Sequence, residues 1–129
     1  MIRLRDVMKN RVESVAADDS AQTAWERMHA RRIRHLVVLD GSEVVGVISD
    51  RDLIGRGRLR RDEKVGDIMA SPVIAGHPEM TLRQAASQMK GRSVGCLPVV
   101  EEGELVGILT VTDILDLVGR EIEFPVDRS

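Results

Sequence analysis

The chain of 129 residues has one cysteine, Cys96, so neither a disulfide bond nor an all-cysteine metal cluster can form within it. It has no tyrosine, one tryptophan and one phenylalanine, which leaves little for a stacking platform that binds single-stranded nucleic acid. No apolar run approaches the ~20 residues that span a bilayer, and the N-terminus lacks the apolar segment of a signal peptide. We therefore expect a cytoplasmic protein that binds neither membranes nor nucleic acid.

Neither charge sign dominates, but the charges are unevenly distributed. Residues 1–64 carry 14 Lys and Arg against 11 Asp and Glu (+3), and residues 65–129 carry 5 against 10 (−5), which sum to −2. The basic half can attract phosphates, whereas the near-neutral total argues against bulk binding of nucleic acid. With 43% apolar and 31% charged residues, the composition is typical of a soluble globular protein.

An internal repeat organises the sequence. A shift of 61 positions superposes residues 7–54 on residues 68–115 without a gap, a period that holds one supersecondary unit. Identical pairs along this alignment include Met8/Met69, Ala24/Ala85, Met28/Met89, Leu36/Leu97, Val38/Val99, Gly46/Gly107 and Asp52/Asp113. Two such copies are expected to pack about a pseudo-twofold axis.

Each copy has the same predicted order of elements. Apolar residues with helical spacing predict a helix over about residues 20–31 and a twin helix whose apolar face has Leu82, Ala85, Ala86 and Met89, and Thr81 with Gln84 has the form of a capping box. Apolar runs at 36–39 and 44–48, and at 97–100 and 105–109, predict two hairpins. Short strands are expected at 13–15 and 73–75, second helices from 50 and 111, and lead-in segments around 4–8 and 65–69. Each copy is therefore β-α-β-β-α, and the predicted fold class is α+β.

The most informative motif occurs at residues 46–52 and again at 107–113. A glycine in a predicted strand is followed by a hydroxyl, Ser49 or Thr110, and three residues later by a carboxylate, Asp52 or Asp113. A carboxylate can accept both hydroxyls of a ribose, and a helix N-terminus favours phosphate. The alternative interpretation is that the hydroxyls only cap helices and the acids only favour the helix dipole. Recurrence of the motif at one offset favours a ligand.

With these motifs, the sequence resembles a tandem pair of cystathionine β-synthase (CBS) domains, in which each repeat ends in G-h-h-[ST]-x-x-D, where h is apolar. Residues 34–38 and 95–99 support the resemblance, which covers residues 4–119. It implies CBS repeats at 1–58 and 65–119, a basic linker at 59–64 and a C-terminal tail at 120–129. The Gly- and charge-rich segment 55–64 is interpreted as a solvated linker, with an arm that steers phosphate as the alternative.

The resemblance implies a regulatory protein that binds AMP, ADP, ATP or S-adenosylmethionine in two clefts between the repeats. By position, Asp52 and Asp113, helped by Ser49 and Thr110, would hold ribose hydroxyls. Adenine would lie near Ser14, Val15 and Leu36, or near Gly76, His77 and Leu97. The repeat-one residue Val37 stands where the family prefers a proline, which repeat two has as Pro98.

The resemblance also predicts that the two clefts differ. Arg34 and His35 would reach the phosphate of the ligand held by Asp113, whereas their counterparts Gly95 and Cys96 carry no fixed charge. The Asp52 cleft would rely on Arg51 or the linker arginines. We therefore expect the Asp113 cleft to bind phosphate more tightly.

The resemblance implies a nucleotide sensor that regulates an unidentified protein partner in trans and forms a homodimer. The main alternative is a ligand-free interaction or dimerisation module. An enzyme is not expected, because Cys96 and the histidines form no complete catalytic set. A metal site is not expected either, because His29, His35, His77 and Cys96 lack the ligand spacing typical of zinc.

Overall fold

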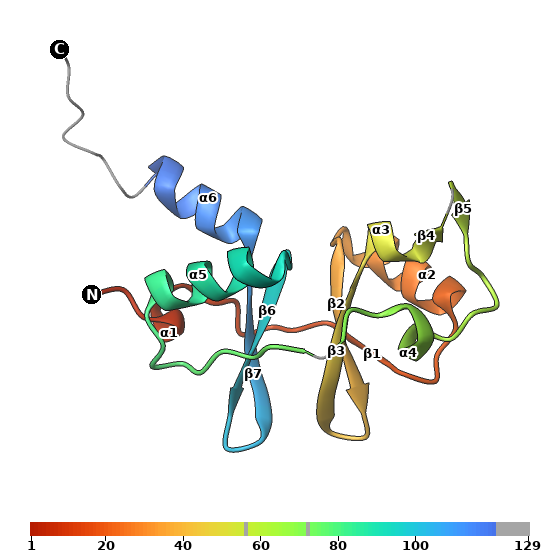
Figure 1. Ribbon diagram of the computed structural model, residues 1–129, viewed down its shortest axis with the longest axis horizontal. Helices are drawn as coiled ribbons and strands as arrows, with labels where there is room; N and C mark the ends of the chain where they lie inside the picture. Colours follow the sequence, from red (N-terminus) through yellow and green to blue (C-terminus); the bar gives the residue numbers. More distant parts are fainter. Residues whose placement is uncertain (56, 72, 121–129) are drawn as a thin grey trace, which may run out of the picture.

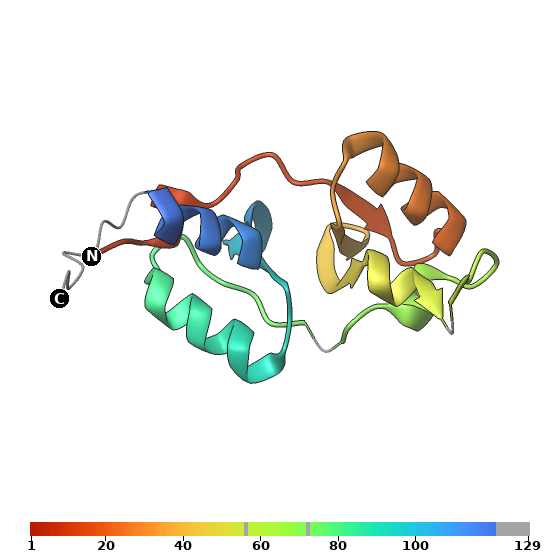
Figure 2. The same cartoon turned by 90° about the horizontal axis from the view of Figure 1, so that it is seen from above.

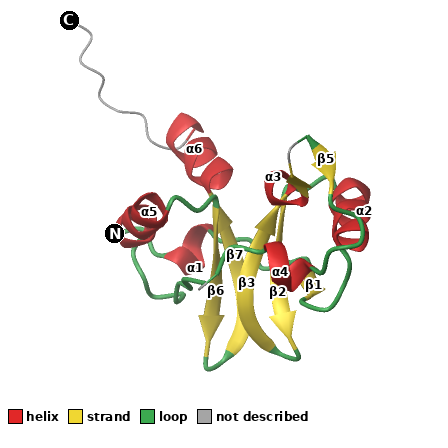
Figure 3. Cartoon of the chain, turned by 45° about the vertical axis from the view of Figure 1, so that its right-hand side comes forward, coloured by secondary structure: helices red, strands yellow, loops and turns green. Residues whose placement is uncertain are grey.

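Two antiparallel β-hairpins face each other at the centre of the molecule, and helices cover their outer sides (Figures 1 and 3). The computed structural model describes residues 1–55, 57–71 and 73–120. The elements of the first repeat are α1 (Leu4–Val7), β1 (Ser14–Ala16), α2 (Ala21–Arg31), β2 (His35–Asp40), β3 (Glu43–Ser49) and α3 (Asp50–Leu53). They are followed by β4 (Ile54–Gly55), β5 (Arg58–Leu59), α4 (Val65–Ile68), α5 (Leu82–Arg92), β6 (Cys96–Glu101), β7 (Glu104–Thr110) and α6 (Val111–Arg120).

One longer helix is expected in the middle of each repeat, and both helices, α2 and α5, are confirmed. The Ser20 hydroxyl accepts a hydrogen bond from the Thr23 amide at 3.2 Å, and Thr81 forms the predicted capping box with Gln84. Both helices end at a residue in the left-handed conformation, Arg32 and Ser93, each with φ of 55°. Hydrogen-bonded caps at both ends therefore set the same length for α2 and α5.

Both predicted hairpins form, but the short strand predicted at 73–75 is wrong. In the first repeat β1 pairs in parallel with β2, and the Val37 amide donates to the Glu13 carbonyl at 3.2 Å. In the second repeat the residue at the equivalent position is Pro98, which has no N–H to donate. Among the residues described there, one parallel bridge is formed, between Gly76 and Val99.

The second helices of the repeats differ in length. α6 extends over ten residues, whereas α3 is a single turn, after which β4 and β5 form a small hairpin. Glycines at 55 and 57 lower the helix propensity where the second repeat has Asp116 and Val118. Among the described helices, none is both long enough and apolar enough to cross a bilayer.

The two lead-in segments are exchanged between the halves, as their colours show in Figures 1 and 2. Leu4 of α1 is fully buried in the core of the second repeat, and its amide donates to the carbonyl of Met80 at 2.9 Å. Val65 of α4 is fully buried in the core of the first repeat, and its amide donates to Asp19 at 2.8 Å. Each half therefore depends on a segment that the sequence places with the other repeat.

A third core joins the two hairpins about the pseudo-twofold axis. It consists of the buried residues Val37, Val47, Cys96 and Ile108. The segment after each lead-in crosses the opposite hairpin, with one antiparallel bridge between Lys9 and Ile108 and the equivalent one between Ala70 and Val47. This arrangement confirms the predicted fold of two packed β-α-β-β-α repeats.

Candidate functional site

Two pseudo-equivalent clefts lie between the repeats, with volumes of about 450 and 530 Å³. Both volumes fall within the ~300–1,000 Å³ usual for small-molecule sites. The Thr110 cleft is lined by Lys9, Arg11, Glu13, Arg32, Ile33, Arg34, His35, Ile108, Thr110 and Thr112. The Ser49 cleft is lined by Arg34, His35, Val47, Ser49, Asp50, Arg51, Asp52, Ala70, Ser93, Val94, Gly95, Cys96, Val111 and Thr112. The clefts adjoin, because they share Arg34, His35 and Thr112.

The paired motif forms the same hydrogen bonds in both repeats. One Asp52 carboxylate oxygen accepts from the Ser49 amide at 2.9 Å, and the Ser49 hydroxyl accepts from the Asp52 amide at 3.3 Å. Thr110 and Asp113 make the equivalent bonds at 3.0 and 3.1 Å. The capping role expected as the alternative is therefore present. It uses one oxygen of each carboxylate, so the second oxygen is available to another partner.

The second carboxylate oxygen differs between the repeats. In Asp113 it lies 3.1 Å from the ammonium of Lys9, and the side chain is only 11% exposed. The residue equivalent to Lys9 is Ala70, which has no charge. Asp52 lines its cleft directly and forms no ion pair within the described part of the chain. The Lys9 contact was not foreseen, because nothing in the sequence around residue 9 indicates a contact with residue 113.

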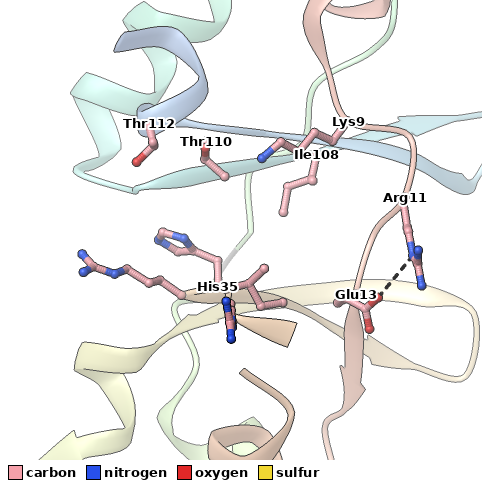
Figure 4. A pocket seen from close by; sticks show the side chains of 10 residues that line it. Lys9, Arg11, Glu13, His35, Ile108, Thr110 and Thr112 are labelled. Atoms are coloured by element: carbon pink, nitrogen blue, oxygen red, sulfur yellow. Dashed lines mark ion pairs between the residues drawn. The ribbon is translucent and has the colours of Figure 1, made fainter. Parts of the chain in front are cut away.

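The Thr110 cleft is strongly basic. Figure 4 shows Lys9 beside Ile108 and Thr110 on one wall, and Arg11, Glu13 and His35 on the other. Glu13 lies 3.8 Å from Arg11 and 3.6 Å from Arg31. Arg32 and Arg34, which also line the cleft, have no carboxylate within ion-pairing distance among the residues described. Two guanidinium groups are thus free to meet an anion.

The Ser49 cleft has balanced charge. Arg34 and Arg51 are opposed by Asp50 and Asp52, and its remaining lining residues are uncharged apart from the titratable His35 and Cys96. The positions equivalent to Lys9, Arg32 and Arg34 are Ala70, Ser93 and Gly95. The Thr110 cleft, which has more basic residues, is the one that the sequence predicts to bind phosphate more tightly.

His35 lies where the two clefts meet. Burial lowers the pKa of its imidazole from the ordinary value of 6.5 and outweighs Asp50 and Asp52, which act to raise it. Room around the ring is limited: a β-carbon on Gly95 would lie 2.8 Å from Nε2 of His35. At neutral pH His35 therefore contributes a neutral imidazole, and the fixed positive charge comes from the arginines and Lys9.

We expect burial of His35 to make stability depend on pH. The folded chain holds the imidazole neutral where the unfolded chain binds a proton, so the stabilisation is complete above the ordinary pKa of 6.5 and is lost as the pH falls below it. His35→Asn should reduce the loss of melting temperature between about pH 7.5 and about pH 5.5. His77→Asn, which alters an exposed imidazole, is the control. Equal losses in the wild type and His35→Asn would show that another group is responsible.

Cys96 is 1% exposed and belongs to the central core between the hairpins. Burial, assisted by the charge of Asp52, raises the pKa of its thiol to about 12. The thiol is therefore protonated at neutral pH, and a protonated thiol is a poor nucleophile and a poor metal ligand. In the described part of the chain, no three His, Cys, Asp or Glu side chains cluster as metal ligands would.

The residues that were expected to contact adenine lie away from the walls of both clefts. Val15, Leu36 and Leu97 are fully or almost fully buried in the repeat cores. Ser14, Gly76, His77 and Pro98 do not line either cleft; His77 is half-exposed, with Nε2 3.9 Å from Glu101. Val15, Leu36 and Leu97 therefore shape the cores beneath the clefts and do not face a ligand in this conformation.

The described linker arginines lie elsewhere, and Arg56 lies outside the described residues. Arg58, Arg60 and Arg61 do not line either cleft, and Arg60 lies 3.4 Å from Glu63. The described linker residues instead lie against the start of α2, where the Ala21 amide donates to the Glu63 carbonyl at 2.8 Å. In the Ser49 cleft the cations are Arg51, as expected, and the shared Arg34.

Comparison with known proteins agrees with this fold. The CBS domain-containing protein YhcV of Bacillus subtilis is 27% identical over 117 residues, which is 88% of this chain and 84% of that protein. A conserved protein of Pyrococcus horikoshii has a structure that matches with a TM-score of 0.80, 28% identity and coverage of 95% of this chain and 96% of the other. CBSX2, solved in complex with AMP, matches with a TM-score of 0.76, 26% identity and coverage of 92% and 96%.

The chain is much shorter than several other relatives. It spans 44% of MJ1225 of Methanocaldococcus jannaschii and 24% of the homoserine O-acetyltransferase of Methanococcoides burtonii. The model of the CBS domain matches it twice, at residues 4–57 and 65–120. The match confirms the resemblance expected from the paired motif, and the chain belongs to the CBS domain family, with two CBS domains in tandem.

Proposed function

We propose that this protein is a regulatory module that binds an adenine nucleotide, AMP, ADP or ATP, in the Thr110 cleft. The observation that carries the proposal is the pair of arginines, Arg32 and Arg34, which line the same cleft as Thr110 and have no carboxylate partners in the described chain. Guanidinium groups bind phosphate oxygens with paired hydrogen bonds. The AMP complex of CBSX2, a structural neighbour at 26% identity, supports this class of ligand.

In this proposal Thr110 and Asp113 hold the ribose, and the ligand rearranges the Lys9 contact. The ribose hydroxyls replace the Lys9 ammonium at the second oxygen of Asp113. Lys9, whose side chain is 67% exposed, then turns toward the phosphate. The apolar side chains of Ile33 and Ile108 offer contacts for the base.

A ligand bound in this way can regulate a partner, because the cleft is built from both repeats. Lys9 follows α1, Arg32 and Arg34 precede β2, and Thr110 ends β7, so a bound nucleotide links elements of both halves. Such a ligand changes the relative free energies of two arrangements of the module, which is what regulation of a partner in trans requires.

The exposed face of α6 supports the proposed homodimer. Val111, Leu115 and Val118 are 41%, 63% and 37% exposed, which is unusual for apolar side chains that lie close together along one helix. Light scattering on the purified chain measures the oligomeric state, and Leu115→Glu is expected to shift a dimer toward monomer.

The test of the proposal is calorimetric titration with AMP, ADP, ATP and S-adenosylmethionine. Arg34→Ala should weaken binding of the preferred nucleotide by about tenfold to a hundredfold, since a hydrogen bond to a charged group contributes ~1.5–3 kcal/mol. Arg83→Ala on α5, an exposed arginine outside both clefts, should leave the affinity unchanged.

The two motif carboxylates provide a second comparison. Asp113→Ala and Asp52→Ala each remove the carboxylate of one capping pair, and Asp113→Ala also removes the contact with Lys9. Asp113→Ala should abolish most nucleotide binding. Loss of binding in Asp52→Ala with normal affinity in Asp113→Ala would assign the nucleotide to the other cleft.

The alternative function is a ligand-free interaction module. It is favoured by the internal satisfaction of both motifs, whose hydroxyls and carboxylates already cap α3 and form the equivalent bonds at the start of α6. A ligand that binds only the folded state raises its stability, by ~2.7 kcal/mol at a hundred times the dissociation constant. A melting temperature that no nucleotide changes would favour this alternative.

A further inference from the structure

The two clefts are built from equivalent segments of the repeats, but the Thr110 cleft is basic whereas the Ser49 cleft has balanced charge. The Thr110 cleft has four basic side chains and one carboxylate on its walls, with Asp113 outside the lining and paired with Lys9, whereas the Ser49 cleft has two of each. The difference arises at equivalent positions, where Lys9 and Arg32 are replaced by Ala70 and Ser93. A phosphate in the Ser49 cleft would therefore meet Asp50 and Asp52 without the cations that offset Glu13 in the other cleft.

Arg34 increases this difference because it lines both clefts. Its counterpart in the second repeat is Gly95, so a single guanidinium group faces two possible sites. When a phosphate in the Thr110 cleft engages Arg34, only Arg51 is left in the Ser49 cleft against two carboxylates.

The remaining groups of the Ser49 cleft suit a nucleoside. One Asp52 oxygen is used in the cap, and the other has no hydrogen-bond or ion-pair partner among the described residues, so it can accept from a ribose hydroxyl. Val47, Ala70 and Val94 supply apolar surface for a base, and the volume of about 530 Å³ lies within the usual range for small ligands.

We infer that the two clefts take different classes of ligand: the Thr110 cleft binds a phosphorylated nucleotide and the Ser49 cleft binds a nucleoside without phosphate. This inference rests on the proposed function, because it adopts nucleotide binding in the Thr110 cleft. It adds that each chain binds one phosphorylated ligand, in the Thr110 cleft. The Ser49 cleft discriminates against phosphate and therefore binds a ligand that lacks it.

The experiment is calorimetric titration of the full chain, first with AMP and then with adenosine added to the AMP-saturated protein. The expected result is one AMP per chain, followed by one adenosine per chain, with any second AMP at least tenfold weaker than the first. Two AMP molecules of similar affinity, or no adenosine binding to the AMP-saturated protein, would overturn the inference while leaving the proposed function intact. If the wild type bound none of AMP, ADP, ATP and adenosine, both the inference and the proposed function would be overturned.

A double substitution, here called the symmetry graft, tests whether the basic residues cause this difference between the two clefts. Ala70→Lys combined with Ser93→Arg places in the Ser49 cleft the cations that the Thr110 cleft has at the same positions. Arg32 already adopts the left-handed conformation that Ser93 has, so arginine is compatible with that backbone. The graft should bind two AMP per chain, and the uncharged control Ala70→Gln with Ser93→Gln should bind one. A folded graft that still binds one AMP would contradict the electrostatic explanation.

Discussion

Leu4→Ala is expected to lower the free energy of unfolding by about 2–5 kcal/mol, the usual cost of removing a fully buried leucine side chain. Leu4 belongs by sequence to the first repeat but packs with Met89, Leu97 and Leu109 of the second. A β-carbon on Gly76 would lie 2.7 Å from its Cδ1, so the leucine fills its space closely. Its neighbours are held by α5 and the β6–β7 hairpin, which cannot collapse readily into the cavity.

Chemical denaturation measures this change, and the control is Met1→Ala, because Met1 is 96% exposed. Amide hydrogen exchange shows which part of the fold the Leu4→Ala substitution destabilises. Protection of the backbone amides from exchange should fall first in α5, β6 and β7 and last in α2 and β2. Val65→Ala should produce the mirror pattern, since Val65 is fully buried in the core of the first repeat. Loss of protection in the first repeat on Leu4→Ala would show that the lead-in segments are not exchanged in solution.

Gly107→Ala is expected to destabilise the fold by about 1–3 kcal/mol, the cost of adding a methyl group where there is no room. The added β-carbon would lie 2.6 Å from the Met8 sulfur and 3.0 Å from the Lys9 carbonyl oxygen. The methionine can move, but that carbonyl accepts a hydrogen bond from Ile108 at 2.9 Å and is held in place. Since Lys9 also lines the Thr110 cleft, the substitution should weaken nucleotide binding as well.

Gly91→Ala is the matched control. Gly91 lies within α5 with no atom within 4 Å of an added β-carbon, so alanine there should stabilise the helix by up to about 1 kcal/mol. The two substitutions add the same methyl group and should have opposite signs in thermal denaturation. A neutral Gly107→Ala would show that the crossing segment adjusts freely.

Gly46, the equivalent glycine of the first repeat, is approached just as closely by the segment that crosses its hairpin. A β-carbon on Gly46 would lie 2.5 Å from the Met69 sulfur and 3.0 Å from the Ala70 carbonyl oxygen, nearly the same contacts as at Gly107. The first residue of the G-h-h-[ST]-x-x-D motif is therefore required by the chain that crosses the hairpin. The hydroxyl and the carboxylate of the motif serve the helix cap and, as proposed, the ligand.

The local structure followed from neighbouring residues. Ser20 and Thr81 were predicted to start helices and do so, since a cap needs only a hydroxyl and an amide three residues away. The prediction for residues 73–75 was wrong because parallel pairing depends on a distant strand, in which Pro98 removes a donor. The second helix of the first repeat ended after one turn, where the following residues pair as β4 and β5.

By itself the sequence determined the repeat, the order of the elements and the position of the paired motif, because periodicity and capping act between residues close in the chain. Only the tertiary structure decided which repeat each lead-in segment joins, that Lys9 contacts Asp113 and that Arg34 lines both clefts. Leu4 and Val65 could each have filled the core of their own repeat equally well by composition. The choice depends on packing and on bonds between residues more than 40 positions apart, which no local pattern encodes.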